Sequence, residues 1–268
     1  MAELKAQILL TNDDGIQSPG LWAAAEALSA LGFVHVVAPR EQYSGGGRSL
    51  PSTSDGIIAA HEMVVHGKNW TVYSVGGSPA QAVLHAVFEI LPQAPDLVVS
   101  GINYGENVGV GVTASGTVGA ALEGASRGIP ALAVSLETDQ KEHFSYSKEV
   151  DFNAAAHFTT HFGRMLLERR LPFDVDVLKV DVPCDASPAT PWEMTRLERQ
   201  NYFEPLRPQR SSWEKAETVG YTRLEDLSRS SPGTDVHTLR VLRRVAVSPL
   251  SLDLTSRVDL SELERLLR

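Results

Sequence analysis

The feature that most constrains this chain is a regular alternation of short apolar runs with helical patterns between residues 7 and 182. The apolar runs have the length and β-branched content of buried strands, and most lead into a segment of helical periodicity. This alternation predicts βαβ units around a mostly parallel sheet with helices on both faces, an α/β fold. The expected strands cover residues 7–11, 34–38, 57–65, 70–75, 95–100, 129–135 and 175–182. The expected helices begin after Pro19, Ser78 and Ser115, and a fourth covers residues 152–169.

The pattern changes after Pro183, where Pro and Arg become frequent and helical periodicity is lost. Residues 202–213 are typical of extended arms. Weaker patterns indicate a hairpin strand over 238–247 and a terminal helix over 260–267. We therefore expect an α/β domain over residues 1–185 and a C-terminal extension over residues 186–268.

Composition excludes several classes of protein. A formal charge of -9 argues against a partner that is a nucleic-acid polymer, because such proteins present an excess of Lys and Arg to phosphates. No apolar run is long enough to span a bilayer. The single cysteine, Cys184, rules out an internal disulfide and is expected to be a small buried hydrophobe. With no export signal in the first residues, these features favour the cytoplasm.

Polar and glycine-rich segments follow the expected strands, where ligands bind in open parallel sheets. Because the carboxyl ends of parallel strands share one edge of the sheet, we expect these segments to face one pocket. They are residues 12–15 (Asn-Asp-Asp-Gly), 44–47 (Ser-Gly-Gly-Gly), 77–78 (Gly-Ser) and the stretch from 101 to 117.

Asp13 and Asp14 are adjacent carboxylates directly after a buried strand, and their repulsion is costly unless a cation neutralises it. The nearby donors Asp13, Asp14, Ser44 and Asn103 all offer oxygen, which suits Mg²⁺ or Mn²⁺ better than Zn²⁺. Taken alone, Asn12 to Gly15 suits a simple turn that caps the next helix equally well. The convergence of the other loops favours the metal site.

Ser115, Gly116 and Thr117 combine a hydroxyl cap, a glycine that allows close backbone approach and a helix N-terminus, which together favour a phosphate group. By itself the segment would more simply be an ordinary helix cap. The three glycines from Gly45 to Gly47 are not a nucleotide-triphosphate loop, since no Gly-Lys-Ser/Thr follows.

Two other patterns are interpreted as structural. His157 and His161 are spaced four residues apart on an expected helix, but no Glu follows His157 and no third zinc ligand is evident. No Gly-x-Ser-x-Gly motif accompanies any serine, so a Ser-His-Asp hydrolase has no support.

Taken together, the motifs resemble those of the SurE family (survival protein E) of 5′-nucleotidases, in order and spacing, over nearly the whole chain. The segments that carry the resemblance are 8–15 (ILLTNDDG), 38–39 (AP) followed by 44–45 (SG), 77–80 (GSPA), 100–109 (SGINYGENVG), 115–124 (SGTVGAALEG), 233–236 (GTDV), 247–250 (VSPL) and 253–255 (DLT).

The resemblance implies a Rossmann-like catalytic domain, here residues 1–185, and a C-terminal extension that exchanges between subunits of a homodimer or tetramer. It also implies a phosphatase that uses one divalent cation per subunit, Mg²⁺ or Mn²⁺, to hydrolyse nucleoside 5′-monophosphates, often 3′-monophosphates and sometimes short polyphosphate. The family's metal ligands correspond to Asp13, Asp14, Ser44 and Asn103. The surrounding phosphate-site motif corresponds to Asn12, Gly45, Asn107, Ser115, Gly116 and Thr117.

The chain departs from the family pattern at Gln81, where Asp is usual, at Ala114, where Tyr is common, and at Lys179 and Asp181, where Asn is usual. These departures bear on substrate preference more than on the reaction.

For the reaction, we expect direct hydrolysis in which the cation orients the phosphoryl oxygens and activates water, and Asp13 or Asp14 assists proton transfer. Ser115, Thr117 and the helix amides would hold the charge of the transition state. One alternative makes Asp13 a covalent nucleophile, although the Asp-x-Asp spacing typical of that chemistry is absent. Another, motivated by Gln81 and Ala114, is a nucleotide-binding regulatory protein without turnover.

Overall fold

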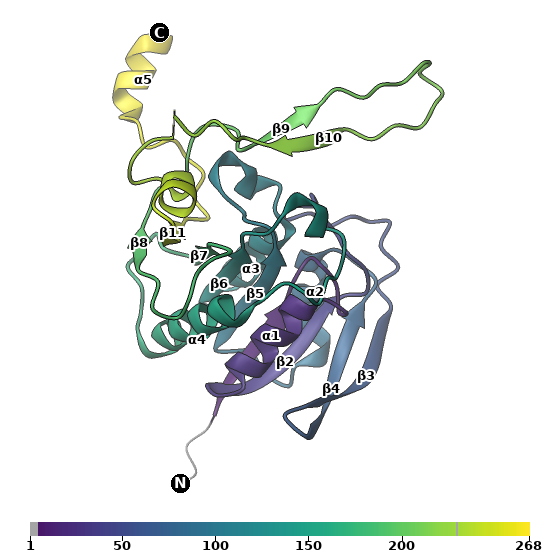
Figure 1. The fold of residues 1–268 in the computed structure, drawn as a ribbon. Coiled ribbons are helices and arrows are strands. Elements are labelled where there is room, and N and C mark those ends of the chain that lie inside the picture. Colours follow the sequence, from purple (N-terminus) through teal and green to yellow (C-terminus); the bar gives the residue numbers. More distant parts are fainter. Residues whose placement is uncertain (1–4, 229) are drawn as a thin grey trace.

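The computed structural model describes residues 5–228 and 230–268, which build a nine-stranded sheet flanked by helices (Figure 1). The strand order is β3-β4-β2-β1-β5-β6-β7-β11-β8. From β4 to β7 in this order, each strand runs parallel to its neighbour. At the two ends of the sheet, β3 is antiparallel to β4, and β11 is antiparallel to β7 but parallel to β8. The expected α/β fold is confirmed. The strands are β1 (Ala6–Thr11), β2 (Gly32–Pro39), β3 (Ile58–Val65), β4 (Lys68–Val75), β5 (Leu97–Tyr104), β6 (Ala131–Leu136), β7 (Val177–Val182), β8 (Trp192–Met194) and β11 (Val245–Leu250).

Helices cover both faces of this sheet, as the alternation predicts. On one face, buried side chains of α1 (Pro19–Leu28) and α4 (Asn153–Glu168) belong to the same core cluster as Ile8 and Leu10 of β1. On the other, buried side chains of α2 (Pro79–His85) and α3 (Gly116–Ala125) share a core cluster with Leu9. Successive side chains of a strand point to opposite faces, so one short apolar run supplies both layers of the core.

The sheet has its topological switch point at β1. This strand pairs with β2 on one side and with β5 on the other, and both pairs are parallel. The connections that leave β1 and β5 therefore diverge to opposite sides of the sheet and open a crevice at the carboxyl ends of these two strands. Residues 12–15 and Asn103 belong to this edge of the sheet.

One boundary differs from the sequence expectation in a way that affects the site. The loop expected to begin at Gly101 begins four residues later, because β5 continues to Tyr104 and Asn103 pairs with Ser135 of β6. Gly101 has a φ of +134° and lies where a Cβ would be 2.3 Å from the carbonyl oxygen of Val134. The glycine favours a loop by local propensity, but here it permits a close strand approach and an irregular register.

The polypeptide after residue 185 contributes to the same sheet. Its strand β11 pairs antiparallel with β7, and β8 pairs with β11. The strand expected over 238–247 is wrong in its first half, because residues 237–241 form a π-helical turn and the strand starts at Val245. The division of the chain at residue 185 stays a prediction.

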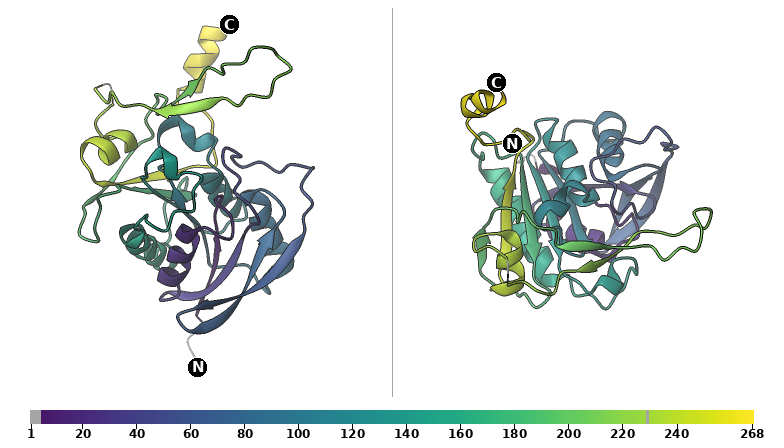
Figure 2. Two further views of the ribbon diagram at one scale, coloured as in Figure 1. Left: turned by 45° about the vertical axis from the view of Figure 1, so that its right-hand side comes forward. Right: turned by 90° about the horizontal axis from the view of Figure 1, so that it is seen from above.

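Two parts of this segment extend away from the sheet. Strands β9 (Phe203–Leu206) and β10 (Gly220–Arg223) form a long hairpin, and α5 (Leu260–Leu267) ends the chain as the expected terminal helix (Figure 2). The short helices η1 (Ala86–Ile90), η2 (Gly109–Thr113), η3 (Gln140–Glu142) and η4 (His237–Val241) complete the described elements.

Three remaining expectations concern Cys184, the first residues of the chain and the absence of a membrane-spanning segment. Cys184 is exposed rather than buried, because it follows the last residues of β7, and its thiol accepts a hydrogen bond from Arg243. The first residues, in which we expected no export signal, include 1–4, which lie outside the described residues. Among the helices of the described residues, none combines the length and apolar character needed to cross a membrane.

Candidate active site

The turn after β1 is fixed by Asn12. Its buried side-chain amide donates to the carbonyl oxygen of Gly15 at 3.0 Å and accepts from the amide of Gly15 at 3.2 Å. Gly15 has a φ of +92°, a backbone conformation that L side chains rarely adopt. Asn12 and Gly15 together close the turn so that Asp13 and Asp14 project from its middle.

Asp13 faces the N-terminus of α3. Its Oδ1 accepts a 2.5 Å hydrogen bond from the hydroxyl of Thr117, and the backbone amides of Gly116 and Thr117 also act on its carboxylate as donors. A Cβ at position 116 would lie 2.7 Å from Cβ and 2.8 Å from Oδ2 of Asp13. The glycine is therefore required for the helix to approach the carboxylate this closely.

Asp14 is held from the opposite side. Its Oδ2 accepts from the amide of Tyr104, at the end of β5, and its Oδ1 accepts from the side chain of Gln42, each at 3.1 Å. The hydroxyl of Tyr146 donates to the carbonyl oxygen of Asp14 at 2.6 Å. Gln42 and Tyr146 were not expected from sequence, because isolated polar residues in loops carry no pattern that marks them.

The electrostatics of this carboxylate pair call for a cation. Burial raises the pKa of Asp13. The pKa of Asp14 lies well above its usual value, because this carboxyl is buried and lies beside the charge of Asp13. Among residues 5–228 and 230–268, no Lys, Arg or His side chain forms an ion pair with either aspartate. Two buried carboxylates without a basic partner are the arrangement that a bound cation stabilises.

Ser44 and Asn103 each lie next to a residue that contacts the aspartates. The amide of Tyr43, which precedes Ser44, donates to the carbonyl oxygen of Asp13 at 2.7 Å. Asn103 precedes Tyr104, and its Nδ2 donates to the carbonyl oxygen of Gly105 at 2.7 Å, which leaves the amide oxygen as its ligand atom. These are neutral oxygen donors.

The donor set therefore fits a hard divalent cation such as Mg²⁺ or Mn²⁺ and not a zinc site. Within the described part of the chain, no group of three or more His, Cys, Asp or Glu residues is arranged to hold a metal. A cation here would rely on two carboxylates together with neutral oxygens.

The remaining expected phosphate-site residues, Ser115, Gly45 and Asn107, have no described hydrogen bond to the two aspartates. The hydroxyl of Ser115 caps α3 by accepting from the amide of Val118 at 3.1 Å, so its side chain serves the helix. Gly45 is exposed, with open space where a Cβ would stand. Asn107 donates to the hydroxyl of Ser135 at 2.8 Å and has no described hydrogen bond to Asp13 or Asp14.

An ion pair attaches the loop that carries Ser44 and Gly45 to α3. Nε of Arg48 lies 2.7 Å from Oε2 of Glu123, a residue 1% exposed, whose other oxygen pairs with Arg127 at 3.0 Å. The amide of Gly47 donates to the carbonyl oxygen of Ala114 at 2.9 Å. No local pattern in the sequence marks this clamp, because Arg48 and Glu123 are 75 positions apart.

The departures from the family pattern have local explanations. Gln81 forms a capping box with Ser78, and its side chain also bonds to Ser54 and to the carbonyl oxygen of Pro51. These contacts stabilise the start of α2. Lys179 and Asp181 are partners of each other in a buried ion pair, so the two changes offset each other in charge. Ala114 accepts the hydrogen bond from Gly47 through its backbone.

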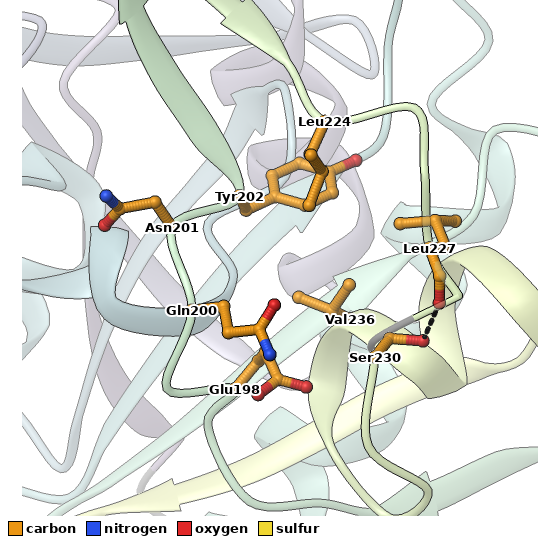
Figure 3. A pocket seen from close by; sticks show the side chains of 8 residues that line it. All are labelled: Glu198, Gln200, Asn201, Tyr202, Leu224, Leu227, Ser230 and Val236. Atoms are coloured by element: carbon orange, nitrogen blue, oxygen red, sulfur yellow. Dashed lines mark hydrogen bonds between the residues drawn. The ribbon is translucent and has the colours of Figure 1, made fainter.

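A separate small pocket lies at the base of the β9–β10 hairpin (Figure 3). It contains none of the residues that surround Asp13. Inside it, the hydroxyl of Ser230 donates to the carbonyl oxygen of Leu227 at 2.8 Å. The residues that line it are Glu198, Gln200, Asn201, Tyr202, Leu224, Leu227, Ser230 and Val236.

Fold and site together define an α/β protein with a buried carboxylate pair that faces a helix N-terminus at the switch point of its sheet. Residues 8–204 match the family described as Survival protein SurE. The chain belongs to this family, as the motifs indicate.

Its relatives match over nearly their whole length. A protein from Thermococcus gammatolerans named 5′-nucleotidase SurE is 42% identical over 265 residues, which are 97% of this chain and 96% of that one. A protein of the same name from Methanosarcina mazei is 39% identical over 266 residues, with 97% of each chain covered. The crystal structure of the SurE protein from Aquifex aeolicus superimposes with a TM-score of 0.76 and 30% identity, covering 98% of this chain and 100% of that one.

Proposed function

We propose that this chain is a 5′-nucleotidase that hydrolyses nucleoside 5′-monophosphates to nucleoside and phosphate with one Mg²⁺ or Mn²⁺ ion per subunit. The observation that carries the proposal is the pair of buried aspartates, which have no basic partner within the described part of the chain and lie against the N-terminus of α3. Relatives that match this chain over almost its entire length carry the name of that activity. The same chemistry extends to 3′-monophosphates and short polyphosphate, because each presents a terminal phosphoryl group.

In this proposal the cation is held by Asp13, Asp14, Ser44 and Asn103. When bound, it neutralises phosphoryl charge and activates the attacking water. The phosphoryl group faces the N-terminus of α3, where the helix dipole favours negative charge.

The chain's remaining groups orient this site. The hydroxyl of Thr117 keeps Asp13 in place, Asn12 closes the turn that presents both aspartates, and Ser115 fixes the first turn of α3. In this proposal, Gly45 and Asn107 belong to the two loops that border the bound phosphate. One of the two aspartates transfers the proton.

A phosphate-release assay over nucleoside 5′- and 3′-monophosphates and polyphosphate, with Mn²⁺ and Mg²⁺, tests the proposal. We expect turnover of 5′-monophosphates that stops in excess chelator and returns when the metal is restored. The Asp13→Asn variant should lose turnover and keep its circular-dichroism spectrum. Activity that persists in chelator would contradict the metal's role.

The same assay separates the two alternatives. Tight nucleotide binding without released phosphate, with every cation, would favour a regulatory protein without turnover. A burst of nucleoside equal to the enzyme concentration, together with phosphate trapped on Asp13, would favour the covalent route.

We further propose that the protein acts in the cytoplasm as a homodimer or tetramer, with residues 1–185 as the catalytic domain and residues 186–268 as the extension that joins subunits. Helix α5 supports this, because its leucines lie exposed on a helix that projects from the body (Figure 1): Leu260 at 61%, Leu263 at 40% and Leu266 at 77%. Light scattering of the full chain and of a chain that ends at residue 259 measures the assembly. The shorter chain should form particles with fewer subunits than the full chain does.

A further inference from the structure

A cluster of three charged side chains lies buried beside the candidate site and takes no part in the proposed chemistry. Lys179 and Asp181 are two residues apart on β7, so their side chains share one face of the strand. Asp235 comes from the segment just before η4. The ammonium of Lys179 pairs with Oδ2 of Asp181 and, at 3.1 Å, with Oδ2 of Asp235, and all three side chains are 0% exposed.

The carboxylates of this cluster hold the backbone of the loop at residues 105–109, which we call the 105–109 loop. Oδ1 of Asp181 accepts from the amide of Asn107 at 2.8 Å, and Oδ2 of Asp235 accepts from the amide of Gly109 at 2.9 Å. Between these two anchors, Val108 is buried among Tyr202, Val236 and other apolar residues of the C-terminal segment. The loop is therefore held by the backbone amides of Asn107 and Gly109, and the side chain of Val108 packs into the core between them.

The same cluster also ties down the C-terminal segment. Oδ1 of Asp235 accepts from the amides of Glu198 and Val236, each at 2.9 Å. Lys179 thus lies between the two carboxylates that connect β7, the 105–109 loop and the segment around residues 198 and 236. Buried networks of this kind specify one arrangement when every member is satisfied.

The other end of the loop reaches the candidate metal site. The side chain of Asn103 donates to the carbonyl oxygen of Gly105, and the side chain of Asn107 donates to Ser135 on β6. A shift of the Asn107 or Gly109 backbone would therefore move groups that border the phosphate, without direct contact to Asp13 or Asp14.

We propose that Lys179 is a positioning residue, which sets the 105–109 loop, and with it Asn107, through the carboxylates of Asp181 and Asp235. Lys179 touches neither substrate nor metal ligands in this role. Removal of its charge leaves two buried carboxylates without a cation, and the anchors of the Asn107 and Gly109 amides rearrange to relieve them. The kinetic consequence rests on the proposed nucleotidase function, whereas the effect on the loop does not.

The first test is steady-state kinetics with one nucleoside 5′-monophosphate and saturating Mn²⁺, at a temperature at which each variant is folded. Lys179→Met should raise KM at least tenfold. Asp181→Ala, which removes the acceptor for the Asn107 amide but leaves Lys179 paired with Asp235, should raise KM as well. The double variant K179Q/D181N, which keeps a donor and an acceptor without the two charges, should return KM to within threefold of the wild-type value.

Leu166→Ala is the matched control, because Leu166 is buried in α4 and belongs to the core cluster of that face of the sheet. It should lower the melting temperature and leave KM unchanged. A KM within twofold of wild type in Lys179→Met overturns the proposal, as does an equal rise of KM in the control. Where Lys179→Met does not fold, an unchanged KM in Asp181→Ala overturns it.

Hydrogen exchange of metal-free protein is the second readout and needs no activity. The amides of Asn107 and Gly109 should exchange at least tenfold faster in Lys179→Met than in wild type, and the amide of Asn107 should do so in Asp181→Ala as well. The Leu166→Ala control should keep the protection of both amides. Unchanged protection in Asp181→Ala overturns the positioning role. A wild-type protein without nucleotidase activity would contradict the proposed function alone and leave this readout in force.

Discussion

The hydroxyl of Thr117 donates a 2.5 Å hydrogen bond to Oδ1 of Asp13, across 104 positions of the sequence. The contact joins the carboxyl end of β1 to the N-terminus of α3, the two elements that would supply the metal ligands and the phosphate seat. Each element depends on the other, since the carboxylate stabilises the helix N-terminus and the helix amides lower the cost of burying the carboxylate.

Because Asp13 and Asp14 repel each other, we expect Asp14→Asn to raise the stability of the metal-free protein and to lower its activity. Asp14→Asn removes a buried charge that lies beside Asp13, so without metal the melting temperature should rise by roughly 2–4 °C, equivalent to about 1 kcal/mol. We expect Mn²⁺ to raise the melting temperature of the wild type and to leave that of the variant unchanged, and turnover should fall by about 10²-fold or more. Differential scanning calorimetry with chelator and with Mn²⁺ measures the first two effects. A lower melting temperature in chelator would contradict the repulsion between the two aspartates.

Gly116→Ala tests the close approach of α3. The new Cβ would lie 2.7 Å from Cβ of Asp13, so the carboxylate or the helix must shift, at a cost of about 1–3 kcal/mol. We expect kcat to fall at least tenfold, measured by phosphate release. Gly111→Ala is the matched control, because a Cβ at that neighbouring glycine meets nothing within 4 Å. Equal activity in the two variants would argue against the tight packing.

The clamp between Arg48 and Glu123 predicts an effect at a distance. Glu123→Gln weakens a buried ion pair and should lower the free energy of unfolding by about 1–3 kcal/mol in urea titrations. The loop that carries Ser44 loses its attachment to α3, so the affinity for Mn²⁺, measured calorimetrically, should fall by about tenfold. Glu89→Gln removes an exposed ion pair with His85 and should change neither quantity.

Glu137 predicts a pH dependence of stability. Burial favours its neutral form, but hydrogen bonding and charge from Arg243, with the charge of Arg240, hold the pKa of Glu137 below its usual 4.5. A depressed folded-state pKa stabilises the protein above pH 4.5, and this contribution is lost as pH falls through the folded-state pKa.

Glu137→Gln should therefore be less stable than wild type by about 1–3 kcal/mol near neutral pH, and the difference should shrink in acid below the folded-state pKa. Urea unfolding of the variant and of wild type, near neutral pH and in acid below the folded-state pKa, measures this difference in stability. Glu264→Gln, at an exposed pair with Arg268, serves as the reference that shows no such trend. A difference that stays constant with pH would contradict the role of the Glu137 charge.

The sequence anticipated the parts of the fold that depend on local pattern. Strand β1, helices α1 and α4, the Ser78 cap and the terminal helix α5 follow from periodicity and capping residues alone. The same local logic went wrong at residues 101–104, where glycine suggested a loop, and at residues 237–241, where apolar residues suggested a strand. In both segments the pairing or packing partner lies far away in sequence and overrides local preference.

The sequence by itself determined the α/β fold and the position of Asp13 and Asp14 directly after the first strand, because these follow from the order of apolar runs along the chain. Only the tertiary structure decided that Asp13 and Asp14 lie buried with no basic partner among the described residues, that Gln42 and Tyr146 hold Asp14, and that Lys179 pairs with Asp181 and Asp235. The physical reason is that burial and hydrogen-bond partners across many tens of residues are set by how the elements pack, which no local pattern encodes.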